Sequence, residues 1–144
     1  MILKSAEETA ATGAALARVS RAGDVITLSG SLGVGKTALA RGLIEALGHQ
    51  SDVPSPSFAI VQPYEELDPP VWHVDLYRIE DRREIEELGL DAAADAVLLV
   101  EWPDRAGESA WIDALALSLD FAPNGDRILT AKVPKSWEGR WPPR

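Results

Sequence analysis

Residues 30–37 of the 144-residue chain read GSLGVGKT, and this stretch carries the strongest indication of its fold class. It fits the pattern G-x-x-x-x-G-K-[ST], whose fixed positions are filled by Gly30, Gly35, Lys36 and Thr37. Glycines allow the backbone to curl so that several N–H groups point at one phosphate chain. The lysine can bridge terminal phosphates, and the hydroxyl can bind Mg²⁺. The stretch therefore predicts a phosphate-binding loop.

The flanking residues support this prediction. Residues 25–28 are a short, mostly β-branched run that predicts a strand, and residues 37–47 carry apolar side chains at helical spacing before Gly48 ends the helix. A helix that begins where the loop ends directs its free N–H groups and its dipole at the anion. The alternative is an ordinary glycine-rich turn with a solvated lysine at position 36.

The rest of the chain predicts alternating strands and helices. Ser5 and Glu8 form a capping box for a helix that reaches about residue 21. Strands are expected at 58–61, 71–76 and 96–100, a short helix at 81–88, a terminal hairpin at 115–121 and 128–133, and an irregular tail at 135–144. We therefore expect a single α/β domain over residues 1–144: a P-loop NTPase-like three-layer sandwich whose sheet mixes parallel and antiparallel strands.

Composition excludes several classes of protein. The chain has no cysteine, so disulfides and thiolate metal sites are impossible, and no apolar run is long enough to span a membrane. These features predict a cytoplasmic protein. The net charge is −9, and residues 64–108 hold fourteen Asp and Glu against four Arg and no Lys. Such a segment disfavours direct binding to nucleic acid. It is either a solvated acidic face or a docking face for a basic partner.

Two acids are candidates to serve a metal ion beside the loop. Glu101 directly follows the apolar run 96–100, and Asp75 lies in the expected strand VWHVDLYR. Alternation in that strand places His73, Asp75 and Tyr77 on one polar face, which we do not expect to be core. Glu101 could instead face water, Asp75 could pair with Arg78, and His73 could simply bond to a neighbour.

Several motifs together resemble one family. GSLGVGKTALARGLIEALG, SPSF, HVDLYR, IEELGLD and VEWPDRAG occur in this order, and the combination resembles the bacterial TsaE (YjeE) family over about residues 5–107. The resemblance implies a small Mg²⁺-dependent ATPase that assists threonylcarbamoyl modification of the adenosine next to the anticodon of tRNA. It implies TsaD and TsaB as partners and contact with tRNA only through that complex. ATP hydrolysis would reset the complex between turnovers.

The resemblance also assigns roles to individual residues. It implies nucleotide contacts from Gly30, Ser31, Leu32, Gly33, Val34, Gly35, Lys36, Thr37, Ala38 and Ser57. It implies Mg²⁺ ligation by Thr37, Glu101 and Asp75, and catalytic roles for Lys36, Asp75 and Glu101. Trp102 would lie near the site, and residues 6–9 would approach the adenine. Ser31 stands where the family usually has an acid, and Ser57 where it usually has threonine. From the residues alone, Ser57 fits either a switch loop or an ordinary loop.

A phosphate loop also occurs in proteins with other functions. A small-molecule kinase needs arginines that clamp the transferred group, and Arg82, Arg83 and Arg105 are candidates, but the chain has no insertion large enough to form a lid. A guanine-reading switch usually carries N-K-x-D, which does not occur here. A module that binds without hydrolysis is disfavoured by the two acids. Because no arginine finger is evident, we expect slow hydrolysis by the isolated chain.

Overall fold

The computed structural model describes residues 1–50, 53, 60–107 and 110–143. One sheet runs through this part of the chain, with strands in the order β1-β7-β6-β2-β5-β4-β3. The strands are β1 (Ile2–Leu3), β2 (Val25–Ser29), β3 (Val61–Tyr64), β4 (Val71–Asp75), β5 (Val97–Glu101), β6 (Leu115–Phe121) and β7 (Arg127–Lys132). The helices are α1 (Ala6–Val19), α2 (Lys36–Ala46) and α3 (Arg82–Glu86), with 3₁₀ turns η1 (Leu90–Ala93), η2 (Pro103–Ala106) and η3 (Lys135–Trp137).

The sheet mixes parallel and antiparallel strands, as predicted, and the structure places the parallel strands at its centre. Strand β2 pairs in parallel with β5 and β6, and β5 pairs in parallel with β4. The outer pairs β3–β4, β6–β7 and β1–β7 are antiparallel. Glu101 is in register with Leu28 on one side and with Asp75 on the other. The carboxyl ends of β2, β4 and β5 therefore meet at one edge, beside the phosphate loop.

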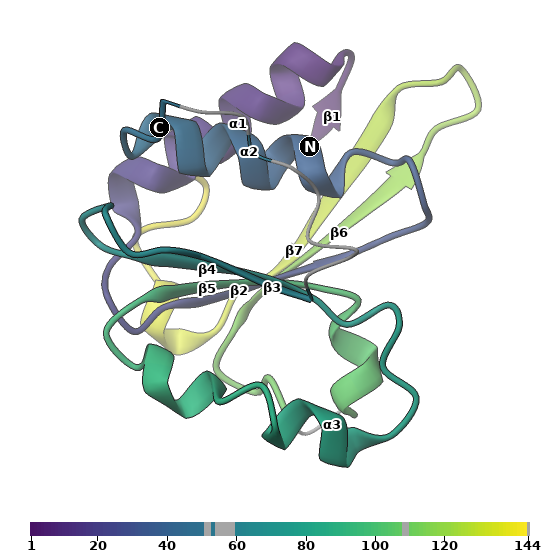
Figure 1. Ribbon diagram of the computed structural model, residues 1–144. Helices are drawn as coiled ribbons and strands as arrows, with labels where there is room; N and C mark the ends of the chain where they lie inside the picture. Colours follow the sequence, from purple (N-terminus) through teal and green to yellow (C-terminus); the bar gives the residue numbers. More distant parts are fainter. Residues whose placement is uncertain (51–52, 54–59, 108–109, 144) are drawn as a thin grey trace.

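Helices cover the sheet on both faces, which confirms the three-layer α/β class (Figure 1). Helices α1 and α2 lie together on one face, and Ile26 and Leu28 of β2 belong to the hydrophobic core beneath them. The other face carries α3, η1 and η2, with a smaller apolar cluster that includes Val74, Leu98 and Val100. All five residues of β5 are buried, as expected for a strand packed on both faces.

The element boundaries differ modestly from prediction. Helix α1 ends at Val19, and α3 is shorter than the predicted 81–88 but begins with the capping box Asp81–Glu84. The strand predicted at 58–61 is β3, which begins only at Val61, while residues 58–59 lie outside the described part. The tail has one turn, η3, and is anchored: Trp137 is fully buried, and Arg140 pairs with Asp24 at 2.7 Å.

A close approach of α1 to α2 holds the phosphate loop's helix in place. Gly13 of α1 sits so near α2 that a Cβ at this position would lie 2.0 Å from the carbonyl oxygen of Leu39. The atoms nearest to that Cβ belong to the backbone of α2, which cannot move aside as a flexible side chain can. We therefore expect Gly13→Ala to lower the free energy of unfolding by about 2 kcal/mol. Denaturant unfolding measures this, with Ala11→Ser on the exposed side of α1 as the control. An effect no larger than the control's would contradict the packing.

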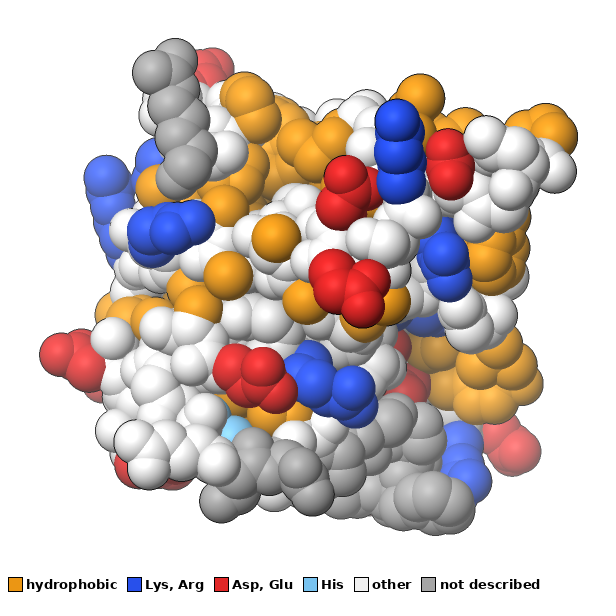
Figure 2. Space-filling model, turned by 90° about the horizontal axis from the view of Figure 1, so that it is seen from above, with side chains coloured by type: hydrophobic (Ala, Val, Ile, Leu, Met, Phe, Trp, Pro, Cys, Tyr) orange, Lys and Arg blue, Asp and Glu red, His pale blue; other side chains and the backbone are white. Residues whose placement is uncertain are grey.

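Charge is distributed unevenly over the two helical layers. The face formed by α1 and α2 shows acidic and basic side chains interspersed (Figure 2). The acidic segment predicted from the sequence instead contributes α3 and η1 on the opposite layer, where Glu86, Asp91 and Asp95 are exposed. None of the described helices is long and apolar enough to cross a membrane.

Candidate functional site

The phosphate loop connects β2 to α2 and is shaped by glycine and by one buried anchor. Gly35 is the N-cap of α2 with φ of +117°, a conformation that side chains rarely adopt, and no side chain caps the helix there. Val34 is fully buried in the core, and its N–H donates to the Ser31 carbonyl at 3.3 Å. The uncapped first turn therefore offers its N–H groups to an anion held by the loop.

A cavity of about 200 Å³ opens over this loop. Its lining combines the loop, the first turn of α2 and the carboxyl ends of β4 and β5. The lining residues are Leu32, Gly33, Gly35, Lys36, Thr37, Ala38, Asp75, Glu101 and Trp102. Residues that are far apart in the sequence thus form one site, at the carboxyl edge where ligands bind open α/β sheets.

Lys36 is folded against the protein. Its Nζ donates to the carbonyl oxygen of Gly30 at 2.7 Å and lies 3.6 Å from the centroid of the Trp102 ring. The residue is only 4% exposed. Burial lowers the pKa of Lys36, and the nearby carboxylates of Glu101, Asp75 and Asp104 oppose part of that effect. The ammonium is therefore incompletely compensated, and an anion in the cavity would stabilise it.

Glu101 is held by a buried histidine. His73 Nε2 lies 2.6 Å from Glu101 Oε2, and both side chains are almost completely buried. Since a carboxylate only accepts hydrogen bonds, Nε2 carries the proton and donates it. The other Glu101 partner is Thr37, whose Oγ1 lies 3.5 and 3.4 Å from the two carboxylate oxygens. His73 therefore fixes the orientation of Glu101 toward the cavity.

Asp75 is the second acid in the cavity. It is 4% exposed, and its Oδ1 accepts the N–H of Tyr77 at 2.9 Å. The expectation that the polar face of β4 is not core was wrong for His73 and Asp75, which are both buried. Tyr77 is exposed, but His73 and Asp75 are buried because β4 lies between β3 and β5, and its carboxyl end faces the phosphate loop. Asp75 lines the cavity directly, and His73 supports it through its hydrogen bond to Glu101.

The donor atoms in the cavity fit a magnesium ion that is shared with a nucleotide. A hydroxyl and two carboxylates, from Thr37, Glu101 and Asp75, are the hard oxygen ligands that Mg²⁺ prefers. Thr37 and Glu101 stand at the long limit of a hydrogen bond. The described residues contain no group of three His, Asp or Glu that could hold a metal alone. Mg²⁺ sites of this kind use one or two carboxylates and rely on phosphate oxygens for the rest.

The structure gathers most of the predicted site residues, but not all of them. Gly30 supports Lys36 through its carbonyl, while Ser31 and Val34 shape the loop without lining the cavity. Ser57 lies outside the described residues. In the N-terminal segment expected near the adenine, Thr9 is buried beside Gly35, where a Cβ on the glycine would be 3.5 Å from its methyl group.

One contact that supports the phosphate loop cannot be read from the sequence. The Arg127 side chain, from β7, donates through Nε to the Val34 carbonyl of the loop at 3.2 Å. The two residues are 93 positions apart, and no local pattern in the sequence links them. The β6–β7 hairpin therefore braces the phosphate loop from the side opposite the two acids of β4 and β5.

A glycine loop between a central parallel strand and a helix, with two acids at the neighbouring strand ends, defines a P-loop nucleotide-binding protein. The family model described as threonylcarbamoyl adenosine biosynthesis protein TsaE matches residues 3–129. The chain therefore belongs to the TsaE family, and membership implies that it binds ATP.

Individual relatives agree with the family assignment. A protein of Streptomyces coelicolor named tRNA threonylcarbamoyladenosine biosynthesis protein TsaE is 45% identical over 114 residues, covering 76% of this chain and 77% of the relative. The protein of the same name from Bacillus subtilis is 39% identical over 126 residues, covering 86% and 78%. The crystal structure of Bacillus subtilis YdiB superposes with a TM-score of 0.80 at 31% identity, covering 96% of this chain and 88% of that one.

Proposed function

We propose that this protein is a Mg²⁺-dependent ATPase that serves tRNA threonylcarbamoyladenosine synthesis together with TsaD and TsaB. The observation that carries the proposal is the convergence of Lys36, Thr37, Asp75 and Glu101 on one cavity over the phosphate loop. Family membership supports the pathway, and the acidic surface supports contact with tRNA only through a partner complex.

Each group in the cavity has a role suited to its chemistry. The loop and the first turn of α2 would hold the phosphates, and Lys36 would exchange its bond to the Gly30 carbonyl for bonds to phosphate oxygens. Thr37 and Glu101 would hold Mg²⁺, which neutralises charge on the phosphate oxygens when bound. Asp75 would accept a proton or a hydrogen bond from the attacking water.

The kinase alternative gains no support from the arginines. Arg83 pairs with Asp81 on the surface at 2.9 Å, and Arg82 packs against Gly107. Neither of these arginines, nor Arg105, is among the described residues that line the cavity. A clamp for a transferred phosphoryl group is therefore absent from the described lining.

Hydrolysis by the isolated chain is expected to be slow, because no arginine is among the described residues that line the nucleotide cavity. An arginine finger is worth on the order of a thousandfold or more, so a partner that supplies one would accelerate turnover strongly. Steady-state phosphate release, measured with the chain alone and with TsaD and TsaB added, tests this. Fast turnover by the lone chain, or no response to both partners together, would count against the proposed function.

The hydrogen bond from His73 to Glu101 predicts that changes at His73 alter the Mg²⁺ dependence of ATP binding. His73→Leu removes the donor to Glu101, and we expect the Mg²⁺ concentration for half-maximal ATP binding to rise by about tenfold or more. His73→Gln keeps an N–H donor in a similar position, so its effect should be smaller. Titration of Mg²⁺ at fixed ATP by calorimetry measures both variants. Equal shifts in the two would show that His73 acts only through packing.

A further inference from the structure

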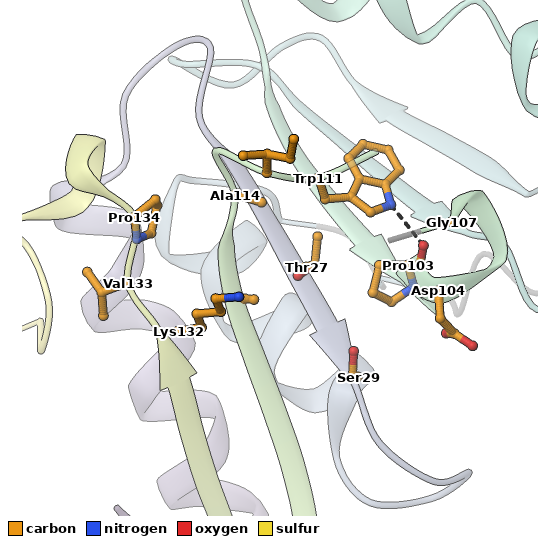
Figure 3. Close-up of a pocket in the computed structure, with 12 residues that line it drawn as sticks. Thr27, Ser29, Pro103, Asp104, Gly107, Trp111, Ala114, Lys132, Val133 and Pro134 are labelled. Atoms are coloured by element: carbon orange, nitrogen blue, oxygen red, sulfur yellow. Dashed lines mark hydrogen bonds between the residues drawn. The ribbon is translucent and has the colours of Figure 1, made fainter. Parts of the chain in front are cut away.

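A second cavity lies on the face of the sheet opposite α1 and α2. Its floor is a row of side chains across three paired strands: Thr27 of β2 is in register with Ala116 of β6, and Ala116 with Lys132 of β7. Because Ala116 is small, Lys132 can reach across it, and Figure 3 shows its side chain extending toward Thr27. The apolar cluster beneath α3 and η1 draws its strand residues mainly from β4 and β5, so this half of the sheet remains open.

The cavity has a volume of about 370 Å³, and its polar and apolar lining residues lie on different sides. Thr27 and Ser29 place two hydroxyls on the floor, and Lys132 stands on one side. Pro103 and Trp111 form an apolar wall on the other side, where the indole Nε1 donates to the Pro103 carbonyl at 2.9 Å. That hydrogen bond holds the Trp111 ring in position beside Pro103.

Two polar groups of this cavity have no side-chain partner in the described part of the chain. Thr27 is 2% exposed, and its hydroxyl is not among the fully enclosed polar atoms that lack a partner, so its small accessible area opens into the cavity. The hydroxyl can therefore donate to a ligand held there. Lys132 likewise has no carboxylate partner in the described part of the chain. Both groups can donate to the same acceptor, and together they point to an anionic ligand.

The remaining lining restricts the kind of anion. Asp104 lies at the edge of the cavity and offsets the charge of Lys132, the one cation of the described lining, so binding becomes less favourable with each further negative charge on the ligand. One ammonium and two hydroxyls suit a single carboxylate, and the wall formed by Trp111 and Pro103 suits a short apolar body. We propose that this cavity is a second ligand site, which binds a small organic monocarboxylate.

The second cavity adjoins two segments of the nucleotide site along the chain. Ser29 immediately precedes Gly30, whose carbonyl holds Lys36, and Pro103 follows Glu101 and Trp102. Asp104 also lies close enough for its charge to act on Lys36. The proposal itself is independent of ATP hydrolysis, because it concerns binding to residues that do not line the nucleotide cavity.

Titration of the ¹⁵N-labelled protein with sodium isobutyrate, followed by amide and indole NMR shifts, tests the site. We expect saturable shifts at Thr27, Ser29, Ala116 and the Trp111 indole, and no saturable shifts with the neutral analogue isobutyramide. Lys132→Met, which alters an exposed side chain, should weaken binding about fivefold, while Lys135→Met, just outside the cavity, should not.

Thr27→Val, which keeps the shape of the side chain, should also weaken binding. Three results would overturn the proposal: no saturable shift at the cavity residues, equal binding of isobutyramide, or unchanged binding in both Lys132→Met and Thr27→Val. Shifts confined to Gly33 and Gly35 would place the probe in the nucleotide cavity and would overturn it as well. Loss of ATPase activity with these shifts intact would affect only the proposed function.

Discussion

Lys36→Met is expected to reduce ATP affinity by about a thousandfold while the protein stays folded. Lys36 is the only cation among the described residues that line the nucleotide cavity, and charge-assisted hydrogen bonds to phosphate contribute about 1.5–3 kcal/mol each. Losing two such bonds corresponds to about 4 kcal/mol. Calorimetric titration with ATP and Mg²⁺ measures the change, and Lys135→Met on the exposed tail is the matched control. Affinity within tenfold of the wild type would contradict the role of Lys36.

The same variant should not destabilise the unliganded protein at neutral pH. Burial lowers the pKa of Lys36 below that of the unfolded chain, so the unfolded state binds more protons between the two values. The cost of the buried charge is present at neutral pH and disappears as the pH rises through that interval toward 10.5. We therefore expect Lys36→Met to unfold at an equal or higher denaturant concentration than the wild type at pH 7, with the difference shrinking as the pH rises toward 10.5. A large loss of stability would show that the bond to Gly30 outweighs the desolvation of the ammonium.

The sequence predicts those parts of the site that depend on local geometry. The phosphate loop, the strand before it and the helix after it follow from glycine positions and helical spacing within about twenty residues. The position of Glu101 at the end of a buried run was also readable, since an unbroken apolar strand pairs in the interior of the sheet. In a parallel sheet, such strand ends share one edge, so the meeting of Glu101 and Asp75 follows as well.

The remainder depends on contacts between distant segments, which no local pattern encodes. Alternation in β4 placed His73 and Asp75 on one face, but the sequence does not specify what covers that face. The polarity of that face predicts that it is not core, whereas Glu101 and the first turn of α2 enclose its carboxyl end. The stacking of Lys36 on Trp102 arises similarly, because Trp102 adopts a left-handed conformation with φ of +58° that directs the ring over the loop.

Glu101→Gln should separate the metal role of this residue from its structural role. The amide oxygen can still accept the His73 Nε2–H, so the variant should fold, but it has lost the charge that favours Mg²⁺. We expect partner-stimulated hydrolysis to fall by about a thousandfold, comparable to the loss of a main electrostatic group in an active site. Phosphate release at saturating Mg²⁺ measures this, and Glu138→Gln on the exposed tail is the control.

ATP binding measured without Mg²⁺ distinguishes a metal role of Glu101 from a general disruption of the nucleotide site. In the absence of Mg²⁺, the Glu101 carboxylate faces the phosphates and repels them, so the Gln variant should bind ATP as tightly as the wild type or more tightly. Adding Mg²⁺ should then strengthen binding in the wild type and have little effect in the variant. If Glu101→Gln weakened metal-free binding and kept the full response to Mg²⁺, Glu101 would support the loop rather than the metal. The two acids would then have different roles from those proposed, because Asp75 and Thr37 would remain as the only ligands from the described lining of the cavity.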